Sequence, residues 1–584
     1  PYGIGSRRLW PALIYPRILF YGYSWNWTYT GAPLVDITSN SYGISIWAIW
    51  GWASGMDPLS AVFDYTSLIS GVVHFVAAGN GGPGWGTVTT PGAGSFVITV
   101  GAGTEFTYGL LYGYLPGGNR EVITWSNRGP SEVGVAKPDI VAIGSFAWAV
   151  GRTWESLGYR VLDGRYAYGL FGGTSQATPM SAGVGALVIS AYKSKYGSRM
   201  PAYLLKTILM NSAYDMGFDE FSQGSGFVDA YRAVSMIMDP SIPKIYSREF
   251  VNDVLLDMNV SYSSFTYGGA VSSPQWYEPK IFVPEIFPGG SAVRTLEISG
   301  SGTLRLYGAK MILIGSQSIC SLASAIVAPQ GLVVNCTSDT LYLNMTGRLM
   351  DSAMIVIDPS KLPRDRFIEI EAVYPFNYFN KGGRYITRDI YLSWAVLSYW
   401  IDLNNDGMIQ SGETAIITYD IRGANIMRIQ VSKLGDQMRE IENLVKTFYG
   451  VDTGSTRKAL VLRIDLFYSW INSVVPIKIR VNTYSYTTWG EVYVTPSTLT
   501  VSGSAKAYVI IRAPYQPGLY SGYVVVEDLS RGGRYLIPVS YFVPVVLGNP
   551  VTLYPVSENS IYKNYYLRGA FDWTWRYESG DWRV

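Results

Sequence analysis

Hydrophobic residues follow two different patterns along the chain, and the change comes near residue 238. Before that point, short apolar runs such as 72–78 and 96–100 alternate with small-residue stretches such as 178–192 and 201–211. Apolar runs of this length are typical of strands buried on both faces, and the small-residue stretches predict closely packed helices. Residues 1–238 are therefore predicted to form an α/β domain with a parallel sheet.

The remaining chain consists of short alternating segments, for example 507–512 and 520–527, separated by Gly, Pro, Ser and Asn. Alternation with a period of two predicts strands with one buried face. The length fits two β-sandwich domains, which we expect at 239–395, of immunoglobulin or fibronectin type, and at 396–545. Residues 546–584 are expected to form a linker and the start of a further β domain, so that the native polypeptide would continue.

Composition excludes one class of partner and favours one location. The 584 residues hold 45 Lys+Arg and 43 Asp+Glu without a dense basic run, so nucleic acid is not an expected partner. Charged residues are only 15% of the chain while tyrosine reaches 46, which favours an extracellular or cell-surface protein. Four glycosylation sequons agree with that location, at Asn26, Asn259, Asn335 and Asn344.

Cysteine and histidine are rare, and this limits the cofactors. Cys320 and Cys336 would suit one disulfide bond that closes a short loop, although two buried thiols are an equal alternative. With one histidine and no CxxC or HExxH motif, the chain has no ligand set for zinc. No organic cofactor is expected.

A serine with the surroundings of a nucleophile lies at 171–180, where Ser175 follows two glycines and precedes Pro179 at the start of a predicted helix. Glycines let a substrate backbone approach, and a helix N-terminus stabilises negative charge that develops nearby. Taken alone, such a segment is more often a glycine turn with a helix cap.

Segment 172–179 closely resembles the nucleophile motif of the subtilisin-like serine proteases, and five other segments match that family in the same order. They are the substrate-binding strand 36–43, the oxyanion segment 76–80, the connecting motifs 126–130 and 137–139, and the domain end 224–229. The resemblance covers about residues 1–238. It implies that residues 1–238 form the portion of a subtilisin-like catalytic domain that follows the catalytic histidine in the sequence.

The resemblance implies roles for individual residues. Ser175 would attack the scissile carbonyl, and the side chain of Asn80 would hold the oxyanion. The residues expected to bind substrate are Ser41, Tyr42, Gly43, Ala77, Ala78, Gly79, Gly173 and Thr174. The protein would be a serine endopeptidase acting on peptides or proteins.

The triad is expected to be incomplete in this chain. The only histidine, His74, lies inside an apolar strand, and we expect it to be a core residue and not the base. A separate N-terminal fragment of the same protease would then supply the aspartate and the histidine. The alternative is an inactive, protease-derived structural or adhesive protein of the cell surface or surface layer (S-layer).

A second motif predicts a structural calcium site. Segment 402–413 places oxygen-bearing residues at positions 1, 3, 5, 7 and 12 of a twelve-residue loop, with glycine at position 6. The expected ligands are Asp402, Asn404, Asp406, the Met408 carbonyl and Glu413. Because a predicted strand follows, the loop would brace a β domain. An acidic turn without metal is the alternative.

The order of a protease followed by long β-rich extensions resembles the pyrolysin and tripeptidyl-peptidase II branch of the family. The amino-acid sequences of segments 36–43 and 573–583 also resemble that branch. A heat-adapted source, a hyperthermophile, would suit the few cysteines and many tyrosines.

Overall fold

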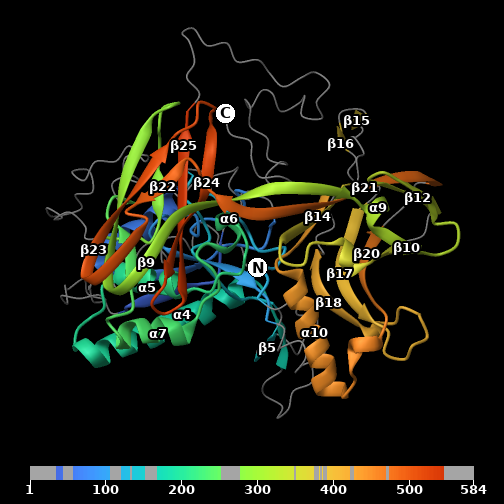
Figure 1. Cartoon of the computed structure of the whole chain (residues 1–584), viewed down its shortest axis with the longest axis horizontal. Helices are drawn as coiled ribbons and strands as arrows, with labels where there is room; N and C mark the ends of the chain where they lie inside the picture. Colours follow the sequence, from blue (N-terminus) through green and yellow to red (C-terminus); the bar gives the residue numbers. More distant parts are fainter. Residues whose placement is uncertain are drawn as a thin grey trace, which may run out of the picture.

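The computed structural model of the chain describes most residues between 35 and 544 (Figure 1). The described ranges are 35–43, 57–83, 85–105, 120–131, 134–145, 147–150, 168–250, 276–346, 350–373, 380–381, 384–385, 391–420, 426–467 and 472–544. The further β domain expected at 546–584 lies outside these ranges. No helix among the described residues combines the length and the apolar character that crossing a membrane requires.

A parallel sheet with the strand order β1-β2-β3-β4 forms the centre of the first part of the chain. Its strands are β1 Ile37–Asn40, β2 Val73–Ala77, β3 Ile98–Gly103 and β4 Ile140–Ile143. Every residue of β2 and β3 is buried, as the continuous apolar runs predicted. The expected α/β domain with a parallel sheet is therefore confirmed.

Helices cover both faces of this sheet. They are α2 Pro58–Ser70, α4 Thr174–Tyr196, α5 Ala202–Ser212, α6 Glu220–Gln223 and α7 Ala230–Met238. Phe63 of α2 packs against His74 of β2, while Phe75, the next residue, faces α4 from the other side. A Cβ at Gly185 of α4 would lie 2.7 Å from the Phe75 ring, so the small residue lets this helix approach the sheet. A hairpin of β5 Ala147–Val150 and β6 Tyr168–Phe171 leads into α4.

The β-rich part contains two sets of strands. The first set, here called the outer strands, lies beside the described residues between 35 and 238, here called the protease-like part. The outer strands are β7 Lys244–Ser247, β8 Ile281–Val283, β9 Ser291–Ser318, β22 Val492–Thr495, β23 Thr498–Arg512, β24 Gly518–Asp528 and β25 Gly533–Val543. Most buried apolar residues of these strands belong to the same core cluster as residues of β2, β3 and β4. The two regions therefore share one hydrophobic core.

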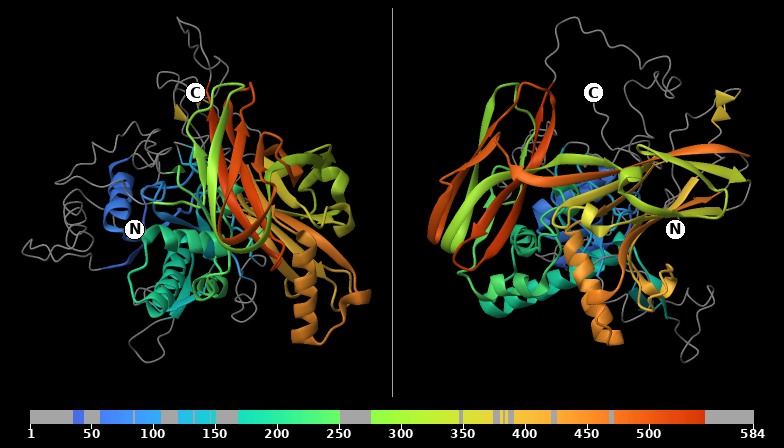
Figure 2. Two further views of the ribbon diagram at one scale, coloured as in Figure 1. Left: turned by 60° about the vertical axis from the view of Figure 1, so that its left-hand side comes forward. Right: turned by 45° about the vertical axis from the view of Figure 1, so that its right-hand side comes forward.

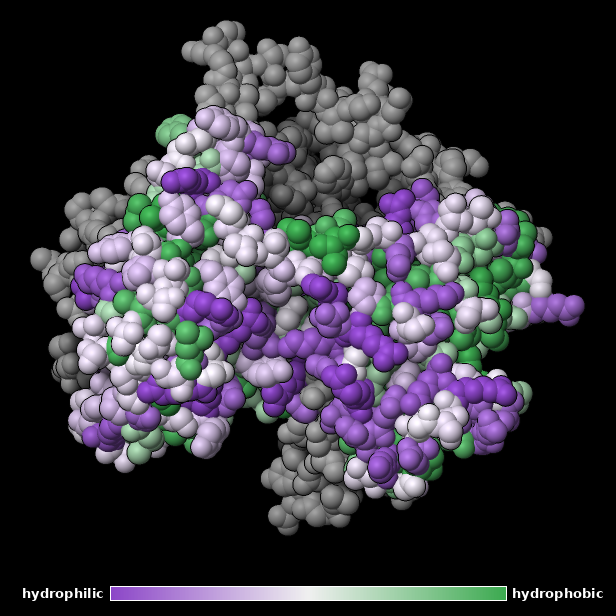
Figure 3. Space-filling model, in the orientation of Figure 1, coloured by the Kyte–Doolittle hydropathy of each residue, from purple (hydrophilic) through white to green (hydrophobic). Residues whose placement is uncertain are grey.

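The second set forms an inserted unit, which we define as residues 319–481, with a core of its own. Its elements are α9 Ile319–Leu322, β10 Ala323–Val327, β11 Val333–Thr337, β12 Thr340–Thr346, β13 Met350–Ile357, β14 Phe367–Val373, β15 Asn380–Lys381, β16 Arg384–Tyr385, β17 Tyr391–Ile401, β18 Thr414–Asp420, β19 Ile426–Val431, α10 Leu434–Tyr449, β20 Lys458–Phe467 and β21 Asn472–Thr488, with short 3₁₀ turns at Pro359–Lys361, Ser411–Glu413 and Thr453–Ser455. Hydrophilic side chains gather over the region of α10 (Figure 3).

Two successive β-sandwiches at 239–395 and 396–545 are not confirmed. Strand β17 crosses the expected boundary, and β9 pairs with β23 along its first half and with β21 along its second. The long β9 and β21 ribbons run from the outer strands into the inserted unit (Figures 1 and 2), within a sheet of 12 strands. Alternation along a sequence identifies strands but not their partners, so the expected division differs from the observed one.

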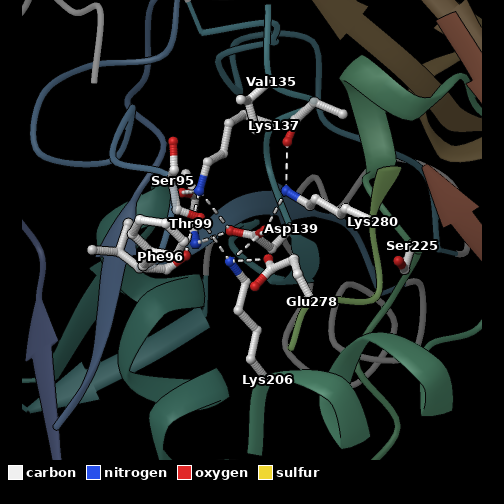
Figure 4. Close-up of polar contacts among 12 residues, drawn as sticks. Ser95, Phe96, Thr99, Val135, Lys137, Asp139, Lys206, Ser225, Glu278 and Lys280 are labelled. Carbon is white, nitrogen blue, oxygen red and sulfur yellow. Dashed lines mark hydrogen bonds and ion pairs between the residues drawn. The ribbon is translucent and has the colours of Figure 1, made fainter. Parts of the chain in front are cut away.

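Buried charges join the outer strands to the protease-like part (Figure 4). Lys137, Lys206 and Lys280 surround the carboxylate of Asp139, with nitrogen–oxygen distances of 3.0 Å for Lys137 and 3.3 Å for Lys206. Lys206 also pairs with Glu278, and all five side chains are buried. Burial lowers the pKa of Lys137 to about 7, whereas the lysines hold the pKa of Asp139 well below its ordinary value although burial alone would raise it.

Candidate functional site

Ser175 occupies the first turn of α4 and is separated from the glycine pair by Thr174. Gly173 precedes the helix with φ +126°, a backbone conformation that a residue with a side chain rarely adopts. The Ser175 hydroxyl donates to the Ser41 carbonyl at 3.3 Å, and the Ser41 hydroxyl donates to the Ser175 carbonyl at 2.8 Å. The structure thus brings together two segments that are 134 residues apart in the sequence.

Asn80 lies beside the same helix start. Its Oδ1 accepts hydrogen bonds from the backbone N–H and the hydroxyl of Thr174, both at 2.9 Å. The Thr174 hydroxyl in turn accepts the Gly79 N–H at 3.1 Å. A Cβ added to Gly173 would lie 3.3 Å from Asn80 Nδ2. Of the two amide atoms, Nδ2 is the nearer to Gly173, in the turn that precedes Ser175.

Asn127 is a supporting residue that the sequence placed only in a connecting motif. Its Nδ2 donates to the Ala78 carbonyl at 2.9 Å, and its Oδ1 accepts the Gly81 N–H at 2.6 Å. Asn127 is buried, so these bonds fix the backbone on both sides of Asn80. Gly79 has φ +108°, and a Cβ there would lie 2.1 Å from Asn127 Nδ2. The supporting role of Asn127 could not be predicted from the sequence, because its partners Ala78 and Gly81 are more than 40 residues away along the chain.

The other residues expected to bind substrate lie around Ser175 and Asn80. Ser41, Tyr42 and Gly43 follow β1, and Tyr42 is 43% exposed. A Cβ on Gly43 would lie 2.4 Å from Thr89 Oγ1, so this position requires glycine. Ala77 and Ala78 are buried at the end of β2, with the Ala78 carbonyl held by Thr89 and Asn127.

His74 is a core residue, as expected. Its Nδ1 lies 2.7 Å from Thr38 Oγ1 and its Nε2 lies 2.7 Å from Thr66 Oγ1, so both ring nitrogens have hydrogen-bond partners. The side chain is fully buried, and burial lowers its pKa to about 3. His74 is therefore neutral and turned toward α2, while Ser175 lies on α4.

The residues of the expected calcium loop lie together between β17 and β18. The carboxylate oxygens of Asp402, Asp406 and Glu413 lie within 4.8 Å of one another. Asn404 Nδ2 donates to Asp406 Oδ2 at 2.9 Å, and Met408 is exposed in the same turn.

The remaining predicted positions fall into two groups. Cys320 and Cys336 form a disulfide bond, with Cα atoms 5.6 Å apart. Asn335 is exposed on β11 and Asn344 is half-buried on β12. Asn26 and Asn259 lie outside the described residues.

The parallel sheet, its helices and the serine in the first turn of α4 form one α/β domain in the first part of the chain. Residues 20–228 match the family model described as Subtilase family. The chain belongs to the subtilase family through this domain.

Several curated proteins share sequence with this part. Pyrolysin of Pyrococcus furiosus is 30% identical over 227 residues, which are 35% of this chain and 15% of that protein. Tripeptidyl-peptidase 2 of Caenorhabditis elegans is 27% identical over 224 residues, which are 37% of this chain and 15% of that protein. An uncharacterized protein of Aquifex aeolicus is 32% identical over 165 residues, 71% of its length. The domain is thus similar to pyrolysin and tripeptidyl-peptidase 2, and the chain spans about 15% of the length of these two relatives.

Solved structures give weaker similarities. A lanthipeptide protease has a TM-score of 0.29 and 21% sequence identity, over 40% of this chain and 66% of its own. Sphericase has a TM-score of 0.22 and 22% identity, over 33% of this chain and 56% of its own.

Proposed function

We propose that the chain is the larger part of an extracellular serine endopeptidase that hydrolyses peptide bonds through an acyl-enzyme on Ser175. The observation that carries this proposal is the position of the Asn80 amide beside the first turn of α4, where Ser175 lies. The amide nitrogen and the Ser175 N–H would both donate to the oxyanion, and the N-terminus of α4 adds a favourable dipole. Ser41–Gly43 and Ala77–Gly79 would flank an extended peptide substrate.

The general base would come from a separate N-terminal fragment of the same protease, which would also carry the aspartate. The chain has a single histidine, and His74 is held by Thr38 and Thr66 away from α4. On α4 itself, Met180 is 39% exposed and Leu187 is 56% exposed. Apolar side chains on the helix that bears the nucleophile favour a covering partner at this face.

Two features support an extracellular location. The Cys320–Cys336 disulfide is typical of proteins that mature in an oxidising compartment. Asn335 lies in an exposed sequon, and its side chain is accessible to glycosylation. The intact mass of the native protein, measured before and after chemical deglycosylation, tests this part of the proposal.

Labelling with a fluorophosphonate tests the enzyme itself. The native protein should take up the label, Ser175→Ala should abolish uptake, and the isolated chain should react at least about 10⁴-fold more slowly because it lacks the base. A second polypeptide with the aspartate and the histidine should copurify. Absence of labelling in a folded native preparation would instead establish the inactive structural protein.

A further inference from the structure

The buried cluster around Asp139 holds an amine against a carboxylate from a distant part of the chain (Figure 4). Lys280 directly precedes the outer strand β8, and Asp139 directly precedes β4 of the parallel sheet. Lys280 Nζ forms an ion pair with Asp139 Oδ1 and donates to the Ala136 carbonyl at 2.5 Å. Both side chains are buried, so the two reactive groups meet in a region shielded from solvent.

The two carboxylate oxygens of Asp139 have different surroundings. Oδ2 accepts the Thr99 N–H at 2.6 Å and a hydrogen bond from Lys137 Nζ at 3.0 Å. Oδ1 lies in ion-pair contact with Lys206 and Lys280, but neither contact has the geometry of a hydrogen bond. Oδ2 therefore has the donors that stabilise negative charge on a carbonyl oxygen under attack, and Oδ1 is the oxygen that can leave.

Glu278 provides a second buried carboxylate beside the first. Its Oε2 accepts the Trp276 Nε1–H at 2.7 Å, and its Oε1 forms an ion pair with Lys206. Lys206 Nζ also lies 3.3 Å from Asp139 Oδ1, so this lysine connects the two carboxylates. Lys206 and Glu278 thus form a route along which protons can reach Oδ1.

Burial makes the separated charges costly. It lowers the pKa of Lys280, which favours the neutral, nucleophilic amine. Trp276, which is bonded to Glu278, packs edge to face against Phe96 with ring centroids 5.6 Å apart, so the cluster has an apolar wall. A reaction that turns one ammonium and one carboxylate into a neutral group would remove the desolvation cost of both.

We propose that Lys280 and Asp139 join in an intramolecular isopeptide bond, which links the outer strands covalently to the protease-like part. Lys280 Nζ bonds to Asp139 Cγ, and the Cγ–Oδ1 bond breaks. The Lys280 ammonium loses two protons, and Oδ1 takes up both and leaves as one water molecule, so the balance needs no oxidant, reductant or cofactor. Glu278 and Lys206 carry these protons.

The amide product has hydrogen-bond partners in place. Its N–H can donate to the Ala136 carbonyl, which Lys280 Nζ already contacts. Its oxygen is the former Oδ2 of Asp139, which keeps the Thr99 N–H and Lys137 Nζ as donors. Both polar groups of a buried amide are thus paired, so burying it costs little.

Mass spectrometry of the folded full chain, denatured, reduced and digested, tests the bond. The digest should contain a branched peptide that joins the segments around Lys280 and Asp139 and is lighter than their sum by one water molecule. Lys280→Arg keeps the charge but cannot form the bond, so the two peptides should be separate. Glu278→Gln keeps both reacting groups and should slow bond formation by about 10²–10⁴-fold, so they should be separate in the freshly folded variant.

Two further variants serve as controls, and circular dichroism establishes that each variant is folded before digestion. Lys506→Arg makes the same exchange at an exposed lysine of β23 and should keep the branched peptide. Ser175→Ala should keep it as well, so the result does not depend on the peptidase proposal. Only separate peptides in the folded parent chain, or a branch at Lys206, would overturn the bond. An equally branched Glu278→Gln would overturn the role of Glu278.

Discussion

Asn80 and Asn127 act on the oxyanion segment in different ways. Asn80 is exposed beside the first turn of α4, and in the proposed enzyme its Nδ2 would donate to a carbonyl oxygen of a bound substrate. Asn127 is buried, and both ends of its amide bond to the backbone around Asn80. The first residue would contact the reacting atoms, and the second positions it.

Replacing Asn80 should therefore affect the chemical step. Asn80→Ala in the assembled enzyme is expected to lower kcat by about 10²–10³-fold, the loss known for the corresponding asparagine of subtilisin, with little change in KM. Steady-state kinetics on a peptide substrate measures both constants. A change confined to KM would show that Asn80 binds substrate without stabilising the transition state.

His74 should control stability at acid pH and not reactivity. The folded imidazole stays neutral down to about pH 3, whereas the unfolded one takes up a proton near pH 6.5. Its contribution to the free energy of unfolding is thus complete above pH 6.5 and declines as the pH falls toward 3. His74→Gln should flatten this decline in urea titrations. Loss of Ser175 labelling in the folded variant would instead make His74 the base.

Among the secondary-structure elements, β9 shows what a sequence leaves undecided. Glycine was expected to separate short strands in this part of the chain, yet Gly300 and Gly302 lie inside a single strand of 28 residues. A Cβ at Gly300 would lie 2.9 Å from Pro243, so this glycine permits a close approach of backbones. By contrast, the buried strands β2 and β3 and the turn before α4 could be predicted, because continuous apolar runs indicate the strands and a glycine pair indicates the turn.

The disulfide stabilises the first helical turn of the inserted unit against β11. Cys320 and Cys336 are 16 residues apart. Replacing both by serine should lower the free energy of unfolding by about 3 kcal/mol, because the unfolded chain regains loop entropy. Urea unfolding with and without a reductant measures this, since the parent chain should lose stability on reduction and the variant should not.

For the whole molecule, contacts between distant segments are the part that the sequence did not reveal. Glu121 is buried in the protease domain, and its carboxylate accepts the Ser432 N–H at 3.0 Å and the Gln437 side chain at 2.8 Å. These partners are more than 300 residues away and belong to the inserted unit. Burial raises the pKa of Glu121 well above its ordinary value. No local pattern marks such a pairing.

The buried charges around Asp139 should couple the outer strands to the protease domain. Glu278→Gln leaves three buried lysines facing one carboxylate, so we expect a loss of about 3–5 kcal/mol in the free energy of unfolding. Calorimetry should show this loss in the unfolding of the core that the outer strands share with the parallel sheet. Asp436→Asn, which breaks an exposed pair with Arg439, is the matched control and should change little.

The continuity of β9 and β21 has a mechanical consequence. Each strand is anchored at one end among the outer strands and at the other in the inserted unit, and the two are hydrogen-bonded to each other between residues 309 and 318 and residues 480 and 488. A load applied to the far end of the inserted unit would therefore be transmitted along two continuous, paired backbones into the 12-stranded sheet that contains the outer strands.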